Sequence, residues 1–290
     1  MRAVFLSQTN RSSPAVVVVG EGLIGSAVTR RLRRRAHTGE RYVPSSWEHP
    51  DFGADCRSLL EGSGATSVEV VWSAGVFGMS SSLEVDRMAA QFEANVSSIV
   101  EAARTVGPVR VHLASSAGAL GCPSGERRFD AVDSPYKSIK AAEEDIVRAL
   151  DVAVRIHRVT SVFGPPSSSG RAGLVGMLLS NALQTRETAL FARTTTMRNY
   201  IHAEDVGEAI VRATLSASND MTLLAAIRSH PMNEVVATAG RVLRRSVPVA
   251  YRPPSNHHDM IFNPRAVSDL VPQRSLSAGM RLVNEALISA

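Results

Sequence analysis

The chain is poor in cysteine and in long apolar runs, and both absences exclude classes of protein. Cys56 and Cys122 are its two cysteines; they lie far apart and form no CxxC pair. This pattern predicts that the protein has no disulfide framework and no zinc or other metal site. It is typical of a protein in a reducing compartment. No apolar run approaches membrane-spanning length, and the first 14 residues lack the apolar core of a signal peptide. We therefore expect a cytoplasmic protein with no membrane partner.

Aromatic residues are also scarce, at 5% of the chain, whereas apolar residues reach 44% over 290 residues. This composition favours a helix-and-sheet protein with one large core or two joined lobes. The net charge of +5 raises the question of a nucleic-acid partner. Six arginines between residues 30 and 41 account for much of the excess. Such a cluster is more typical of a solvated helix face or of a site for small phosphates, so we expect no nucleic-acid partner.

Short β-branched segments alternate with helical patterns through the first half of the chain. Strand patterns lie at 14–20, 67–75, 109–116 and 152–164, with a weaker one at 41–47; helix patterns lie at 26–35, 83–105 and from 134 onward. This alternation predicts an α/β fold, a Rossmann-like doubly wound parallel sheet covered by helices on both faces. After Gly164 the alternation becomes irregular. We expect a Rossmann domain over 14–164 plus about 197–215, and a smaller, mostly helical substrate lobe over 165–196 and 216–290.

A glycine-rich turn follows the first of these strand patterns. The segment VVVVGEGLIGSAV places Gly20, Gly22 and Gly25 as GxGxxG between a strand and a helix, with Leu23 and Ile24 completing the loop. In that context Gly20 permits the tight turn, Gly22 lets a pyrophosphate approach the backbone, and Gly25 lets the helix pack closely. The helix N-terminus adds N–H groups for the phosphates. These five residues are the predicted dinucleotide contacts.

The residues that follow the second strand pattern bear on the choice of dinucleotide. An NAD site usually places a carboxylate there to bind the ribose. Here Ser45 and Ser46 occupy that region, after the arginine-rich helix end. Serines and arginines suit a 2′-phosphate better than a carboxylate would, so the sequence slightly favours NADP(H) over NAD(H).

The segment SPYKSIKAAEE places Tyr136 and Lys140 one helical turn apart. A tyrosine can exchange a proton at a reacting oxygen if its pKa falls from about 10 toward neutrality, a drop that needs roughly 4 kcal/mol. A lysine ammonium about 4 Å away supplies roughly that much at an effective dielectric constant near 20. An isolated YxxxK is more often just an exposed helix start. Ser116, which ends the strand pattern at 109–116, adds a hydroxyl where open α/β sheets place their site residues.

Taken in order, these motifs resemble those of the extended short-chain dehydrogenases/reductases, of the NAD-dependent epimerase/dehydratase type, which act mostly on nucleotide sugars. The resemblance runs from about Val16 to the C-terminus and includes the segments ADCRSLL, VVWSAG, NVSSIVEAAR, LASSAGALG, YKSIK, RVTSVFGPP and MRNYIHAEDVGEAI. It implies catalytic roles for Ser116, Tyr136 and Lys140. It also implies that Tyr136 and Lys140 contact the cofactor, with Lys140 holding the nicotinamide ribose. It implies further cofactor contacts at Asp55, Cys56, Ala74, Gly75 and Asn95, and substrate contacts at Ser115, Ser161 and Arg198.

By the same resemblance, His202 and Asp205 fix the fold of the return strand and helix, and no catalytic role falls to His157, His257 or His258. The chain also departs from the family pattern at several positions, which predicts an unusual substrate pocket. These departures are Val19, Leu120, Ile139, Ser161 and Phe163.

The resemblance restricts the reaction without naming the substrate. A dehydratase of this family carries an Asp-Glu pair after the catalytic hydroxyl, whereas Ala117 and Gly118 follow Ser116 here. The sequence therefore predicts hydride transfer at a sugar carbon of a nucleotide sugar, with 4-ketoreduction slightly favoured. An epimerase with retained NAD is the alternative, and a non-catalytic NADP-binding regulator is an alternative of another class. The resemblance also implies a homodimer paired through the long helices after the fourth and fifth strands.

Overall fold

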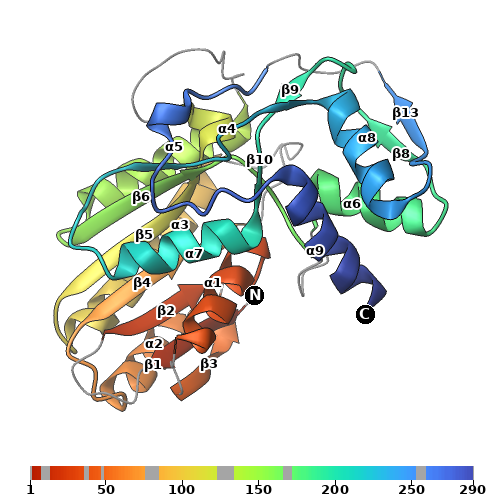
Figure 1. The fold of residues 1–290 in the computed structure, drawn as a ribbon. Coiled ribbons are helices and arrows are strands. Elements are labelled where there is room, and N and C mark those ends of the chain that lie inside the picture. Colours follow the sequence, from red (N-terminus) through yellow and green to blue (C-terminus); the bar gives the residue numbers. More distant parts are fainter. Residues whose placement is uncertain are drawn as a thin grey trace.

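A computed structural model describes residues 2–7, 14–35, 39–46, 49–75, 85–122, 134–165, 172–252 and 259–289. Its main feature is a seven-stranded sheet with the order β11-β6-β5-β4-β2-β1-β3 (Figure 1). Apart from β1, neighbouring strands in it are parallel, which confirms the predicted Rossmann-like α/β fold. The strands are β1 (Arg2–Ser7), β2 (Ala15–Val19), β3 (Gly39–Ser46), β4 (Val68–Trp72), β5 (Val109–Ser116), β6 (Ala153–Val159) and β11 (Thr222–Leu224).

Strand β1 is the feature that the sequence patterns do not predict. It lies antiparallel between β2 and β3, with Ala3 opposite Val19 and Leu6 opposite Val16. Ala3, Val4 and Leu6 are buried, so this short apolar segment gains its core contacts by filling a slot in the sheet. Strand β3 lies at the sheet edge, where a proline such as Pro44 is tolerated.

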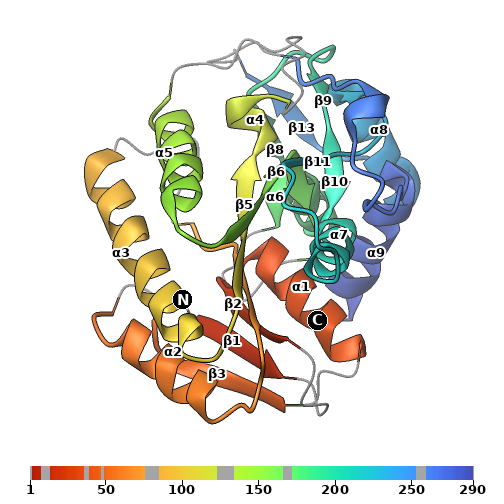
Figure 2. The ribbon, with the colours of Figure 1, turned by 90° about the vertical axis from the view of Figure 1, so that its left-hand side faces the viewer.

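Helices cover both faces of the sheet. Figure 2 shows α2 (Phe52–Glu61), α3 (Val85–Arg104) and α5 (Pro135–Ala149) on one side, and α1 (Leu23–Arg34) and α7 (Ala203–Thr214) on the other. Every residue of β2 and β4 is buried, as strands covered on both faces require. Two separate apolar clusters, one on each face, form the core. No helix among the described residues is long and apolar enough to cross a membrane.

The second half of the chain builds a smaller lobe beside the carboxyl edge of the sheet, to the right in Figure 1. Its apolar cluster joins α6 (Gly173–Leu183), α8 (Met232–Leu243) and α9 (Leu276–Ile288). Short strands complete it: β8 (Thr188–Leu190) pairs with β13 (Val249–Tyr251), and β9 (Met197–Arg198) pairs with β12 (His230–Pro231). Strand β10 (Tyr200–His202) pairs with β7 (Ser161–Phe163) and leads back to α7. Because β11 joins the main sheet, the chain returns to the Rossmann domain beyond the predicted range 197–215.

Candidate functional site

The carboxyl ends of β2, β4 and β5 open onto a cavity of about 1080 Å³ that the smaller lobe closes from the other side. This is the edge at which open α/β sheets bind ligands. Eleven of the residues predicted from the sequence line it: Gly22, Leu23, Ile24, Ala74, Gly75, Ser115, Ser116, Tyr136, Lys140, Ser161 and Arg198. The remaining predicted residues do not: Gly20, Gly25, Ser45, Ser46, Asp55, Cys56 and Asn95.

The glycine loop forms one end of this cavity. Gly20 has a φ of +98°, and a Cβ there would lie 2.5 Å from the backbone nitrogen of Ala74. A Cβ on Gly25 would lie 1.7 Å from the Gly20 carbonyl oxygen. At Gly22, by contrast, a Cβ would meet no atom within 4 Å. Close packing of the backbone therefore requires glycine at positions 20 and 25. Gly22 instead leaves the backbone at the start of α1 open to a ligand, as a dinucleotide pyrophosphate requires.

The residues predicted to bind the adenosine half lie farther away. Ser45 and Ser46 end β3, which is two strand positions from β2 because β1 intervenes. That separation is about 10 Å, since neighbouring strands lie about 4.8 Å apart. The backbone N–H of Ser45 donates to Asp55 Oδ2 at 3.1 Å, so these two predicted residues do meet. The Cys56 side chain lies in the apolar core, where burial raises the pKa of its thiol to about 12.

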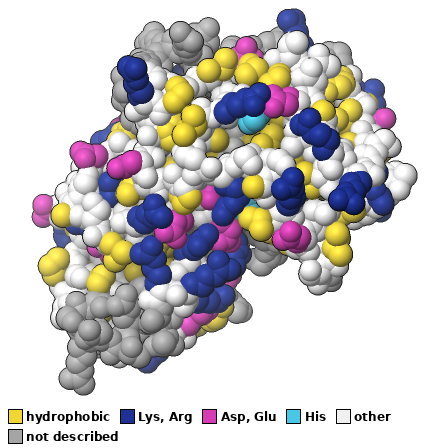
Figure 3. All heavy atoms as spheres, in the orientation of Figure 1, with side chains coloured by type: hydrophobic (Ala, Val, Ile, Leu, Met, Phe, Trp, Pro, Cys, Tyr) yellow, Lys and Arg dark blue, Asp and Glu magenta, His cyan; other side chains and the backbone are white. Residues whose placement is uncertain are grey.

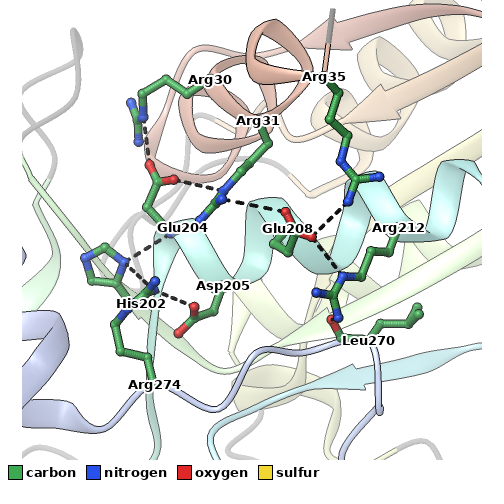
Figure 4. Close-up of polar contacts among 10 residues, drawn as sticks. All are labelled: Arg30, Arg31, Arg35, His202, Glu204, Asp205, Glu208, Arg212, Leu270 and Arg274. Atoms are coloured by element: carbon green, nitrogen blue, oxygen red, sulfur yellow. Dashed lines mark hydrogen bonds and ion pairs between the residues drawn. The ribbon is translucent and has the colours of Figure 1, made fainter.

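The arginine cluster on α1 is held by carboxylates of α7 (Figure 4). Arg30 and Arg31 pair with Glu204 at 2.7 and 3.2 Å, and Arg35 pairs with Glu208 at 3.0 Å. Basic and acidic side chains accordingly intermingle on this face of the molecule in Figure 3. These ion pairs fasten α1 to α7. Arg33 pairs with Glu40, so four of the six clustered arginines have carboxylate partners, which weakens the sequence argument that the cluster binds a 2′-phosphate.

The three predicted catalytic residues lie on one wall of the cavity. Ser116 ends β5, and its Oγ accepts a hydrogen bond from the backbone N–H of Ala119 at 3.2 Å, which starts α4 (Ala117–Leu120). Tyr136 lies in the first turn of α5, which Ser134 caps by accepting from the N–H of Lys137. Lys140 follows one turn later, with its Nζ 6.0 Å from the centre of the Tyr136 ring. The fold thus brings a strand-end hydroxyl, a phenol and an ammonium together.

Lys140 has a partner to which the motifs do not point. Its Nζ donates to Glu143 Oε2 at 2.6 Å, and the two side chains are only 10% and 8% exposed. Burial opposes protonation of Lys140, but the charges of Glu143, Tyr136 and Glu144 outweigh it and raise the pKa of the ammonium above its ordinary value. The segment KAAEE could have indicated this pair, because Glu143 lies three residues after Lys140 and therefore on the same face of the helix.

Ser115 is held differently from Ser116. Its Oγ donates to Glu144 Oε1 at 2.6 Å, and Arg158 of β6 donates to both carboxylate oxygens of Glu144 at 2.9 Å. Burial raises the pKa of Glu144, but the hydrogen bonds from Arg158 and Ser115 prevail and lower it. The Ser115 hydroxyl proton is thus committed to a buried ion pair, although the residue still lines the cavity.

The wall from the smaller lobe is mostly apolar, with Arg198 as its cation. Burial lowers the pKa of Arg198, whose Nη1 donates to the carbonyl of Met197 at 3.0 Å. Ser161 lies at the start of β7, with its Oγ 3.8 Å from the Met260 sulfur. The apolar lining residues, which no motif indicates, are Leu174, Met177, Phe191, Met232 and Met260.

No histidine among the described residues lines the cavity. His202 caps α7 by accepting from the N–H of Glu204, and Arg274 pairs with Asp205 beside it (Figure 4). His157 is fully buried and joins a chain of hydrogen bonds across the sheet, from Thr222 through His157 and His112 to Glu69. His257 and His258 lie outside the described residues.

Comparisons with known proteins agree with this geometry. The UDP-glucose 4-epimerase of Thermotoga maritima, solved with UDP-glucose, has a TM-score of 0.74 at 19% identity, covering 94% of this chain and 98% of that one. The UDP-glucose 4-epimerase of Thermus thermophilus, in complex with NAD, has a TM-score of 0.73 at 22% identity, covering 95% and 99%. The ADP-L-glycero-D-manno-heptose-6-epimerase of Helicobacter pylori has a TM-score of 0.74 at 18% identity, covering 95% and 96%. At these identities the likeness establishes a shared fold.

Comparison with curated protein sequences finds no match. The model of the NAD dependent epimerase/dehydratase family, however, matches residues 16–223, well over half of the chain. That match spans the glycine loop, the Ser116–Tyr136–Lys140 wall and the return through β10 and α7, and it confirms the predicted resemblance and enzyme class. This chain belongs to the NAD-dependent epimerase/dehydratase family.

Proposed function

We propose that this protein transfers hydride at a carbon of the sugar in a nucleotide sugar, with a nicotinamide dinucleotide bound along the glycine loop. One observation carries the proposal. Ser116, Tyr136 and Lys140 share one wall of a cavity that has the open backbone of Gly22 at one end and Arg198 on the facing lobe. A dinucleotide fits the residues present, because the space over Gly22 and the N-terminus of α1 can receive its phosphates.

Each residue of the wall has a definable task. Tyr136 would take the proton from the sugar hydroxyl when hydride leaves the carbon, and return it when hydride comes back. Ser116 would donate to the same sugar oxygen and fix its position. Lys140 would stabilise the phenolate of Tyr136 and bind ribose hydroxyls, and Arg198 would bind the diphosphate. The nicotinamide, when bound, supplies the hydride acceptor.

Epimerisation with retained NAD is the form of this reaction that we favour. The preference for 4-ketoreduction rested on a site for NADP(H), and three of the six arginines invoked for that site pair with Glu204 and Glu208 instead. The structural relatives are sugar-nucleotide epimerases, two of them 4-epimerases of UDP-glucose. No residue beside Ser116 takes the place of the missing Asp-Glu pair, because Ala117 and Gly118 occupy those positions.

One observation keeps 4-ketoreduction with NADP(H) as a second candidate. Ser45 Oγ is buried and has no hydrogen-bond partner among the described residues, so it could accept a ligand group. No observation favours the non-catalytic regulator, since all three polar residues of the wall are in place.

The nucleotide retained by purified protein separates the two reactions. The protein is denatured and the released nucleotide identified, and conversion of UDP-glucose, UDP-glucuronate and UDP-N-acetylglucosamine is followed. Released NAD with interconversion of 4-epimers supports the epimerase. A protein that purifies empty, takes up NADPH and reduces a 4-keto sugar nucleotide supports the reductase. A protein that binds neither cofactor contradicts both.

The homodimer and the cytoplasmic location stay predictions. Large exposed apolar side chains occur among the described residues, but none of them lies on α3 or α5, the helices expected to pair. A dimer formed there would use small, polar and charged side chains. Sedimentation of the purified protein over a concentration series tests the dimer directly.

A further inference from the structure

Among the described residues that line the cavity, Glu143 is the only acidic one, and its carboxylate lies against the ammonium of Lys140. The Nζ to Oε2 distance is 2.6 Å, and both side chains are at least 90% buried. A pair at this spacing on an exposed helix face contributes a few tenths of a kcal/mol. Buried charges behave differently, because an ammonium removed from water needs a partner to stay charged.

The other charged groups around Lys140 are already engaged. Glu144, its second acidic neighbour on α5, accepts from both Arg158 of β6 and Ser115 of β5. Arg148 donates to Glu144 as well, at 2.6 Å. Tyr136 is the third group whose charge raises the pKa of Lys140. Glu143 is thus the carboxylate in direct contact with the ammonium.

The hydrogen bond between Lys140 and Glu143 also determines which ammonium donors remain for a ligand. An ammonium has three N–H donors, and the bond to Glu143 uses one of them. Lys140 itself lines the cavity, so its remaining donors face the space that a ligand would occupy. We propose that Glu143 is a positioning residue of this site: its carboxylate holds the Lys140 ammonium on the α5 wall and directs the remaining N–H groups toward the bound ligand.

This role has a consequence for the chemistry, which rests on the proposed function. A free ammonium would stabilise the phenolate of Tyr136 with its full charge, whereas one in contact with a carboxylate acts as a dipole whose field falls off faster. Glu143 therefore keeps Lys140 protonated over a wide pH range and moderates its effect on Tyr136. The ammonium stays available to ribose hydroxyls even at alkaline pH.

The chain offers an unusually clean test of the ion pair, because Lys137 and Lys140 are its only two lysines. Protein made with lysine labelled with ¹³C at Cε gives two side-chain signals, and the variant Lys137→Arg leaves only that of Lys140. The Lys140 signal is titrated with pH in this background, with and without Glu143→Gln. The matched control is Asp145→Asn, which removes a carboxylate from the exposed face of the same helix.

With Glu143 in place, the midpoint should lie above the ordinary lysine value of about 10.4. In Glu143→Gln it should fall below that value, because burial then acts without its largest counter-charge. Asp145→Asn should leave it unchanged. An unchanged midpoint in Glu143→Gln, or an equal change in Asp145→Asn, would overturn the proposal. This measurement needs neither substrate nor turnover, so it stands even if the proposed reaction is wrong.

Titration of NADH binding then tests the direction of the donors. In the wild-type protein the NADH dissociation constant should stay nearly flat from pH 7 to pH 9.5. In Glu143→Gln it should rise by about tenfold over the same range, as the ammonium loses its proton and its charged hydrogen bonds to the ribose. A flat NADH profile in the variant contradicts the donor role. The titration uses protein from which any retained nucleotide has been removed. Absence of both retained nucleotide and NADH binding in the wild type contradicts the proposed function, while the lysine titration still decides the role of Glu143.

Discussion

The two ends of the site differ in how tightly the fold holds them. At the α5 end, Ser116, Tyr136 and Lys140 share one wall of the cavity, with the Lys140–Glu143 pair and the Ser115–Glu144–Arg158 contacts around them. At the β3 end, Ser45 and Ser46 lie outside the cavity lining and beyond the intervening strand β1, and Asp55 and Cys56 of α2 lie outside the lining as well. The comparison shows that the spacing of two residues along one helix fixes their relative position. The distance between residues on different strands depends instead on the order of the strands in the sheet.

Replacement of Tyr136 by Phe should have the largest effect of any single substitution in the site. The variant keeps the ring but cannot exchange a proton, so turnover of the nucleotide sugar should fall by about 10³-fold, within the range of general acid–base catalysis. NADH affinity should change little, because the hydroxyl is not expected to carry cofactor binding. Steady-state kinetics and NADH fluorescence titration measure the two quantities. Normal turnover would show that the α5 end is not the proton-transfer end.

Replacement of Arg158 by Met tests how far the α5 end depends on its buried ion pair. Glu144 has a side chain only 2% exposed, so loss of Arg158 leaves its charge with the half-exposed Arg148 and the hydroxyl of Ser115 as partners. The free energy of unfolding should fall by about 3 kcal/mol, as expected when one partner of a buried pair is removed. Urea unfolding measures it. Replacement of Arg104, which pairs with Asp151 at the surface, by Met is the control and should cost less than about 1 kcal/mol. Equal losses in the two variants would mean that the buried pair contributes nothing special.

Buried histidines should make the whole protein sensitive to acid. Burial lowers the pKa of His112 to about 3 and that of His202 to about 4, and it also lowers that of His157. These histidines bind protons near pH 6.5 only after unfolding, so stability is fully present above pH 6.5 and is lost as pH falls below it. Glu69, whose pKa burial raises to about 7, and Asp205, raised to about 6, act in the opposite direction and offset part of the loss. We expect a net loss of about 1 kcal/mol between pH 6.5 and 5.5.

Urea unfolding at the two pH values measures this loss. His202→Asn keeps a side chain that can cap α7 but removes a titrating group, and it should reduce the pH dependence by about one proton. His49→Asn, at an exposed position, is its control. A stability that rises between pH 6.5 and 5.5 would show that the carboxyls, rather than the histidines, dominate.

The same contrast explains what could be predicted from the sequence. The strands β2 to β6, the helices α1, α3 and α5, and the side-by-side placement of Tyr136 and Lys140 follow from local periodicity and helical spacing. The helix α2 lies between two of these strands, and no sequence pattern predicted it. The insertion of β1 could not be predicted, because strand neighbours in a sheet are chosen by long-range burial that leaves no local pattern. The α1 arginines illustrate a second limit: their partners Glu204 and Glu208 lie more than 160 residues away in sequence.

Replacement of both Ser45 and Ser46 by alanine should have the smallest effect, and it tests whether the β3 end belongs to the site at all. If β1 keeps these serines about 10 Å from the glycine loop, they cannot reach a ribose phosphate bound there, and the ratio of NADPH to NADH dissociation constants should change by less than about threefold. Fluorescence titration with both cofactors measures the ratio, and Ser58→Ala on the exposed face of α2 is the control. A change of tenfold or more, confined to NADPH, would place the buried Ser45 hydroxyl against the 2′-phosphate. The two ends of the site would then be continuous across β1, and reduction with NADPH would replace epimerisation as the favoured reaction.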